Sequence, residues 1–507
     1  MKQYFKSNTL RLAENVLRSV LDKNEDEVLT HVKNLFREIF GKNFSESIEN
    51  NNLLRYKSLG GDKGNIPFLG FLYENAPQSG IYENFSLVLF PNKNTSQILL
   101  AYGIGTGGIT DDAEWLSQPW VRRSIQLLLK LIEKHQWNVV DTKSFVKEDI
   151  TDEVSSIPDV IKNHLGDFYD YDELWKKYGK FLPSVCVVEA DENGAKAFLA
   201  HLLLYSNFRG WPLKKDYREI LENIFSEILS IWQINPSIDK VKALLLQRKY
   251  IILQGPPGTG KTYMAQKIAK KLKEEGEIFD YKIIQFHPSI SYEDFIEGIK
   301  PDTEANQLLF RKYKGPFIEA IENAKNGKGY LLIIDEVNRG DLGKILGEAI
   351  FLLEPNEERE IKLRSGRKVK MPKNLYIIGT MNTADRSLAL LDYAIRRRFA
   401  FIDILPSSKE LEKILKGQKL EETLIDKILK KYNSLNEIFF KYASEEEILL
   451  QPGHTYFIAS SEEELKNRLR YEVKPLLKEY MQEGKLELAK NELLAFIKSL
   501  DVYEERN

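Results

Sequence analysis

The chain has 507 residues, of which 43% are hydrophobic and 29% charged, a composition typical of a globular protein with more than one domain. Its 73 lysine and arginine residues nearly balance its 75 aspartate and glutamate residues. The chain as a whole therefore has no excess of positive charge that would indicate binding to nucleic acid. It also has no excess of negative charge that would indicate a basic partner. The single cysteine, Cys186, excludes a disulfide framework and a cysteine-rich zinc module.

The first residues lack the long apolar stretch of a secretion signal, and no run of 18 apolar residues occurs anywhere in the chain. We therefore expect no membrane span and a cytoplasmic location.

The sequence pattern changes along the N-terminal part of the chain. Residues 1–50 carry apolar positions at helical spacing, and short β-like runs follow in a segment rich in glycine, proline and asparagine. A helix is expected over residues 119–135. Residues 150–235 again show a mixed helical pattern. We predict a separate α+β domain over residues 1–235 for recognition or adaptor binding, with subdomains at about 1–150 and 151–235. The β-like runs are Ile66 to Tyr73, Phe85 to Phe90 and Ile98 to Tyr102.

The best domain boundary is Asn235-Pro236-Ser237, a turn followed by a serine suited to cap a new helix. From Tyr250 onward strands and helices alternate, which predicts an α/β fold with a mostly parallel sheet flanked by helices. We assign residues 236–406 to this nucleotide-binding domain. The charged helical residues 407–507 are predicted to form a helical lid.

A phosphate-binding loop follows the first strand of this domain. The apolar run from Tyr250 leads into Gly255-Pro256-Pro257-Gly258-Thr259-Gly260-Lys261-Thr262 and then into a helix, the strand–loop–helix context of a P-loop. Glycines allow backbone N–H groups to converge on phosphate oxygens. Lys261 supplies a positive charge to the β- and γ-phosphates, and the Thr262 hydroxyl is a ligand for Mg²⁺.

A second apolar strand ends in two adjacent acids, Asp335 and Glu336. A continuous apolar run is typical of a central strand that is buried on both faces. We expect Asp335 to hold the Mg²⁺ shell and Glu336 to polarise the attacking water. An acid pair after an apolar run is common by chance, but its position about 70 residues beyond a P-loop is not.

Further polar residues complete the predicted site. A third strand ends near Asn382 and Asp385, which we expect to orient water at the γ-phosphate; the alternative is that they cap the next helix. The run Arg396 to Arg398 would ordinarily be a solvated charged face. Here Arg397 or Arg398 could instead reach the γ-phosphate of a neighbouring subunit.

These motifs resemble the AAA+ family and, more narrowly, the McrB family of NTPase subunits in modification-dependent restriction systems. The similarity covers roughly residues 240–485. The segments that carry it are Gln285 to Gly298, Ile334 to Asp341, Met381 to Leu388, Asp392 to Phe399, Gly453 to Phe457 and Pro475 to Tyr480.

The resemblance implies a hexameric ring that hydrolyses GTP, with ATP as the alternative, in the presence of Mg²⁺. It also implies an McrC-like partner that carries the nuclease, and DNA, modified or not, as the target. By the matching positions, Asn382 and Asp385 position water, Arg397 or Arg398 acts in trans, and Arg339 lies near the subunit interface.

Two other functions remain open at this stage. A MoxR-like ATPase would use the same motor to remodel proteins, and a nucleotide switch would bind without significant turnover. Glu336, Asn382 and the arginines argue against a switch, and the run Met381 to Arg386 favours restriction over remodelling. The sequence shows no set of residues typical of a nuclease active site, so we expect the partner to cleave the DNA.

Overall fold

The computed structural model divides the chain into two units by its internal contacts. Residues 1–232 with 440–442 form the first unit, and residues 233–439 with 443–507 form the second. No helix in the part of the chain that the structure describes is long and apolar enough to cross a membrane. The described residues are 4–57, 66–77, 83–92, 96–108, 112–116, 118–139, 144–147, 174, 177–232, 234–301, 310–324, 329–354, 359–384 and 393–501.

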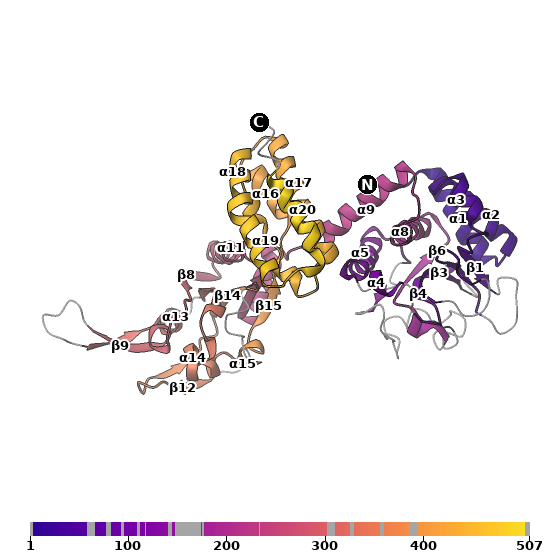
Figure 1. Ribbon diagram of the computed structural model, residues 1–507. Coiled ribbons are helices and arrows are strands. Elements are labelled where there is room, and N and C mark those ends of the chain that lie inside the picture. The colour runs from indigo at the N-terminus through magenta and orange to yellow at the C-terminus, as the bar shows by residue number, and fades with distance from the viewer. Residues whose placement is uncertain are drawn as a thin grey trace. The chain divides into compact units, whose positions relative to one another are not determined.

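The first unit is an α+β fold around a six-stranded antiparallel sheet of order β1-β2-β3-β4-β6-β5. Strand side chains alternate between faces, so Phe71 lies in a large cluster with the helices while Phe68 and Phe90 lie in a second cluster. Its elements are α1 (Ser7–Leu21), α2 (Glu25–Ile39), α3 (Lys42–Ser47), β1 (Leu54–Lys57), β2 (Phe68–Phe71), β3 (Phe85–Pro91), β4 (Gln97–Ile104), α4 (Ala113–Leu116), α5 (Pro119–His135), β5 (Phe145–Val146), η1 (Gly179–Phe181), β6 (Ser184–Glu189), α8 (Glu192–Arg209) and α9 (Lys215–Trp232) (Figure 1).

The second unit contains the predicted parallel sheet. Its five strands lie in the order β15-β7-β14-β11-β8, and every neighbouring pair is parallel. The central strands are largely apolar up to their carboxyl ends because helices cover both faces. The elements of this α/β part are α10 (Ile238–Arg248), β7 (Tyr250–Gly255), α11 (Lys261–Glu274), β8 (Ile278–Gln285), α12 (Tyr292–Phe295), α13 (Pro316–Ala324), β11 (Gly329–Asp335), η2 (Val337–Arg339), α14 (Leu342–Leu346), η3 (Gly347–Leu352), β14 (Leu375–Asn382), α15 (Tyr393–Arg396) and β15 (Ala400–Asp403).

Two antiparallel ribbons interrupt the strand–helix alternation, and the sequence analysis did not predict them. One pairs β9 (Glu297–Pro301) with β10 (Phe310–Lys314), and the other pairs β12 (Glu360–Lys362) with β13 (Lys368–Lys370). Arg367, in the turn that joins β12 to β13, lies 3.9 Å from Glu297 of the first ribbon and 3.3 Å from Glu322 of α13. In Figure 1 the β9–β10 ribbon extends away from the parallel sheet.

The entry into the second unit follows the predicted turn. The Ser237 side chain accepts a hydrogen bond from the Lys240 N–H and so caps α10, as expected. The Asn235 amide donates to the Leu405 carbonyl at 2.8 Å and accepts from the Leu405 N–H at 2.7 Å. The start of this unit is thereby fixed to the chain that follows its last sheet strand.

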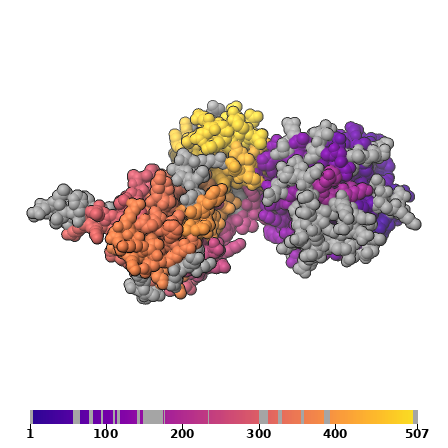
Figure 2. All heavy atoms as spheres, turned by 90° about the horizontal axis from the view of Figure 1, so that it is seen from below, coloured from indigo at the N-terminus to yellow at the C-terminus, as the bar shows by residue number. Residues whose placement is uncertain are grey.

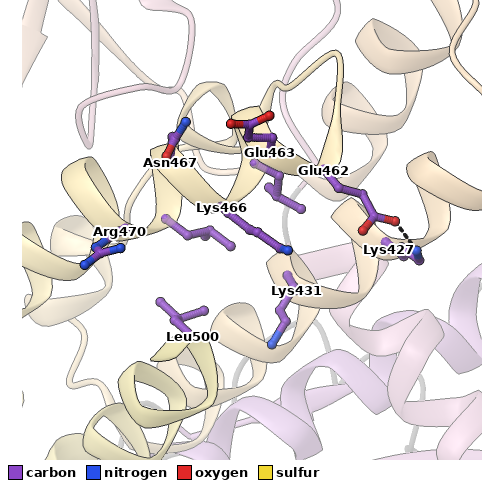
Figure 3. Close-up of a pocket in the computed structure, with 10 residues that line it drawn as sticks. Lys427, Lys431, Glu462, Glu463, Lys466, Asn467, Arg470 and Leu500 are labelled. Atoms are coloured by element: carbon purple, nitrogen blue, oxygen red, sulfur yellow. Dashed lines mark hydrogen bonds and ion pairs between the residues drawn. The ribbon is translucent and has the colours of Figure 1, made fainter. Parts of the chain in front are cut away.

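The remaining residues, 408–501, form the C-terminal helices, the last of which are coloured yellow in Figure 2. A pocket of about 180 Å³ lies among them, lined by Leu465, Leu469 and Leu500 together with charged residues such as Lys431 (Figure 3). No residue of the phosphate loop lines it. The elements are α16 (Ser408–Gly417), α17 (Glu422–Tyr442), η4 (Glu447–Leu450), η5 (His454–Phe457), α18 (Glu462–Arg468), η6 (Leu469–Val473), α19 (Lys474–Gln482), η7 (Glu487–Ala489) and α20 (Lys490–Asp501).

Candidate nucleotide site

The predicted phosphate loop joins the end of β7 to the start of α11. Gly258 and Gly260 have φ angles of +75° and +79°, a region that other L-residues rarely adopt. A β-carbon at Gly255 would lie 2.1 Å from the Ile404 carbonyl oxygen, so a side chain has no room there. Thr259 closes the turn by donating to the Pro256 carbonyl at 3.0 Å. The loop is therefore held in one shape, in front of the N-terminus of α11.

Lys261 is folded into this loop. Its side chain is buried, and Nζ donates to the carbonyls of Gly255 at 2.9 Å and Pro256 at 2.7 Å. Burial lowers the pKa of Lys261 to about 8, while the charges of Asp335 and Glu336 act in the opposite direction. Neutral carbonyls are weaker partners for an ammonium group than a phosphate would be. The cation is thus placed to exchange these contacts for phosphate oxygens.

Asp335 and Thr262, the two predicted Mg²⁺ ligands, are in direct contact. The Thr262 hydroxyl donates to Asp335 Oδ1 at 2.6 Å. Thr380, on the neighbouring strand β14, donates to the same oxygen at 2.5 Å and accepts from the Glu336 N–H at 3.0 Å. The sequence alone does not single out Thr380, because a threonine inside an apolar strand carries no distinguishing pattern.

The donor set fits Mg²⁺. A hydroxyl and a carboxylate are the hard oxygen ligands this ion prefers, and it commonly takes the rest of its shell from phosphates and water. Within the described ranges, no cluster of three or more His, Cys, Asp or Glu side chains could hold a metal alone. We therefore expect Thr262 and Asp335 to bind Mg²⁺ together with a nucleotide.

Glu336 has a strained backbone and a polar surrounding. Its φ and ψ angles of +56° and +50° are left-handed, at a cost of about 1–2 kcal/mol for a residue with a β-carbon. Asn382 Nδ2 donates to its carboxylate at 3.3 Å and Gln285 Nε2 at 3.2 Å, while Arg339 Nε lies 2.5 Å from Oε2. Asn382 thus lies beside Glu336, and Gln285 and Arg339 are additional contacts of the same carboxylate.

The strand order explains why these residues meet. Strands β7, β14 and β11 are adjacent and parallel, so their carboxyl ends lie at one edge of the sheet. Each of the three ends contributes one part of the site: the phosphate loop follows β7, Asn382 ends β14, and Asp335 ends β11. Asp385, the other predicted water-positioning residue, lies outside the described residues.

The two candidate arginines have different surroundings. The Arg398 side chain is 2% exposed; its Nη2 lies 2.7 Å from Glu354, and its Nη1 donates to the Ala394 carbonyl at 2.6 Å. The Arg397 side chain is 65% exposed, and its Nη2 lies 3.0 Å from the same carboxylate. Arg397 could leave that surface pair for another partner at little cost, whereas Arg398 is part of its own subunit's interior.

The chain is similar to known proteins over the region that carries this site. Residues 250–399 match the AAA domain of the dynein-related subfamily. The EcoKMcrB subunit of a type IV methyl-directed restriction enzyme from Escherichia coli is 36% identical over 287 residues, 53% of this chain and 61% of that protein. A component of the type II restriction enzyme BsuMI from Bacillus subtilis is 27% identical over 36% of this chain and 65% of its own length. The matches thus span about three fifths of these two relatives, and the resemblance predicted from the motifs is confirmed.

Proposed function

We propose that this chain, in which residues 250–399 form an AAA domain, is an Mg²⁺-dependent GTPase or ATPase that drives a DNA restriction complex. The observation that carries the proposal is the convergence of Lys261, the Thr262–Asp335 pair and the Glu336–Asn382 pair at one sheet edge. A protein that only bound nucleotide would have no use for the last of these pairs.

Each group has a distinct task in this proposal. The backbone of the phosphate loop and Lys261 would hold the triphosphate, and Thr262 and Asp335 would hold Mg²⁺, which would offset charge on the phosphate oxygens. Glu336 accepts a hydrogen bond from the attacking water and draws its proton away as the oxygen approaches the γ-phosphorus. Asn382, 3.3 Å from Glu336, fixes the direction of that carboxylate.

The wider biological role rests on the named relatives, both of which are components of restriction enzymes. We propose that the chain forms a hexameric ring, that Arg397 acts across the subunit interface, and that an McrC-like subunit cuts the DNA. Residues 1–235 are proposed to recognise DNA, modified or not. We further propose that residues 407–507 close over the nucleotide as a lid.

The test is a turnover assay with MgGTP and MgATP, each with and without the product of the neighbouring gene. We expect hydrolysis of one nucleotide, stimulated by a nuclease-bearing partner and lost when Mg²⁺ is chelated. Absence of turnover with both nucleotides, with and without the partner, would contradict the proposal. Turnover stimulated by a protein substrate and not by the partner would favour a remodelling ATPase.

Replacing Glu336 by glutamine tests the assignment of the two acids. The variant Glu336→Gln should bind Mg²⁺–nucleotide with unchanged affinity and hydrolyse it on the order of 10²-fold more slowly, because the amide cannot take up a proton. Binding is measured by titration with a fluorescent nucleotide, and turnover by phosphate release. If nucleotide binding is lost instead, Glu336 belongs to the metal shell and its role with Asp335 is reversed.

A further inference from the structure

A segment of the C-terminal helices lies directly on the phosphate loop. The Gly453 N–H donates to the Pro257 carbonyl at 3.0 Å, and the Thr455 N–H donates to the Gly258 carbonyl at 3.0 Å. The Thr455 hydroxyl donates to the same Gly258 oxygen, also at 3.0 Å. A carbonyl oxygen has two lone pairs, so Thr455 alone satisfies both of those on Gly258. The segment thereby holds two successive peptide groups of the loop.

The backbones of the segment and the loop touch, which leaves no room for a side chain at two positions. A β-carbon at Gly453 would lie 2.0 Å from the Gly258 carbonyl carbon and oxygen, and 2.5 Å from the Thr259 nitrogen. A β-carbon at Gly258 would lie 2.7 Å from the Tyr456 ring and 2.8 Å from the Thr455 hydroxyl. Gly453 therefore covers the peptide bond between Gly258 and Thr259.

These carbonyl contacts determine where the N–H groups of the same two peptides point. In a trans peptide, the form of every described peptide of this chain, the C=O and N–H bonds point in opposite directions. Because the Pro257 and Gly258 carbonyls face the segment, the N–H groups of Gly258 and Thr259 point away from it. Successive N–H groups of a loop that contains left-handed residues form a concave site for an anion.

The direction of these peptides decides whether the loop attracts or repels a phosphate. An N–H group presents a positive partial charge to a phosphate oxygen, whereas a carbonyl in the same place presents a negative one. Gly258 lacks a β-carbon, so its own conformation does not select one direction. The donors that select the direction seen here come from Gly453 and Thr455, in the C-terminal helices.

We propose that Thr455 is a positioning residue of the nucleotide site, which together with the Gly453 backbone holds the Gly258 and Thr259 N–H groups toward the bound phosphates. This inference rests on the proposed NTPase function. It assigns part of phosphate binding to a residue that lies about 190 positions beyond the loop in the sequence and outside the matched AAA domain at 250–399.

The test compares Thr455→Val, which keeps the shape of the side chain and removes its hydroxyl, with the unaltered full-length chain. Titration with fluorescent GTP and ATP analogues in Mg²⁺, well below the melting temperature of each protein, should show affinity weakened about 5-fold, the usual effect of losing one neutral hydrogen bond. KM should rise by the same factor while kcat stays within about twofold, because Thr455 contacts neither Glu336 nor Asn382. A purely structural role predicts a lower melting temperature with unchanged affinity.

Four further variants complete the design. Thr455→Ala repeats the loss of the hydroxyl, and Thr455→Ser, which restores it, should bind within about twofold of the unaltered chain. Gly453→Ala should weaken binding about 100-fold, since its β-carbon would separate the segment from the loop and break all three hydrogen bonds. The φ angle of −67° at Gly453 suits alanine, so this effect comes from the contact alone. Thr9→Val is the matched control in the first unit, where Thr9 is buried and hydrogen-bonded to Tyr217; its affinity should be unaltered.

The possible failures are distinguishable. If the unaltered chain binds nucleotide, Lys261→Ala abolishes that binding, and the valine and alanine variants of Thr455 bind within twofold of the unaltered chain, the inference is wrong and the NTPase proposal stands. Equal weakening in the serine and valine variants would also contradict it, because the hydroxyl would then not be responsible. If the unaltered chain binds neither analogue, the proposed function itself fails.

Discussion

Replacing Lys261 by alanine should abolish nucleotide hydrolysis and weaken nucleotide binding. In the structure Lys261 is the buried cation inside the phosphate loop, with its ammonium group held by two carbonyls of that loop. Its removal leaves the β- and γ-phosphates without a charged partner on the protein, both before and during transfer of the phosphoryl group. Turnover is measured by phosphate release, and affinity by titration with a fluorescent nucleotide.

The matched control is Lys270→Ala, which removes an exposed lysine from the same helix. It should hydrolyse nucleotide like the unaltered chain. Near-normal turnover in the Lys261 variant would show that the loop is not a phosphate site, and the assignment of function would fall with it.

Replacing Arg397 by alanine should lower turnover about 10³-fold while nucleotide binding is retained, if this arginine completes the site of a neighbouring subunit. Turnover per subunit of the unaltered chain should then rise with protein concentration. Mixing Arg397→Ala with Lys261→Ala should restore part of the activity. The first variant supplies an intact phosphate loop, and the second supplies an intact arginine, so some interfaces in a mixed ring are complete.

Arg398→Ala provides the contrast. Arg398 is buried against Glu354, so its loss should destabilise the folded chain by about 3 kcal/mol, the usual scale for breaking a buried ion pair. Chemical denaturation measures this difference, and Arg397→Ala should lie within about 0.5 kcal/mol of the unaltered chain, since its pair with Glu354 is largely exposed. If the mixture stays inactive while both variants still assemble, Arg397 does not act in trans.

The sequence allowed the parallel sheet and the main polar residues of the site to be predicted, because both follow from local patterns. Apolar runs of four or five residues, with glycines or acids directly or one residue after them, mark the ends of buried parallel strands. Once three such strands share a sheet, Lys261, Asp335 and Asn382 must lie at the same edge. The hydrogen bond between Thr262 and Asp335, the two proposed Mg²⁺ ligands, is a consequence of that geometry.

The ribbons and the supporting contacts could not be predicted in this way. The strands β12 and β13 have the sequences Glu-Ile-Lys and Lys-Val-Lys, too short and too charged to be separated from a loop. Thr380 and Gln285 act through residues that are distant in sequence, so no spacing rule connects them to the site. Arg397 and Arg398 differ only in burial, which adjacent arginines do not reveal.

The hydrogen bonds between the phosphate loop and the segment around Gly453 bear on which part of the chain can fold by itself. A fragment ending after the last sheet strand, near residue 406, would keep every strand of the parallel sheet but lose the donors that satisfy the Pro257 and Gly258 carbonyls. It would also lose the Leu449 carbonyl that accepts from Thr383, at the end of the strand that carries Asn382. We therefore expect the nucleotide site to fold cooperatively from segments about 200 residues apart, and the smallest autonomous folding unit to extend well beyond the matched AAA domain.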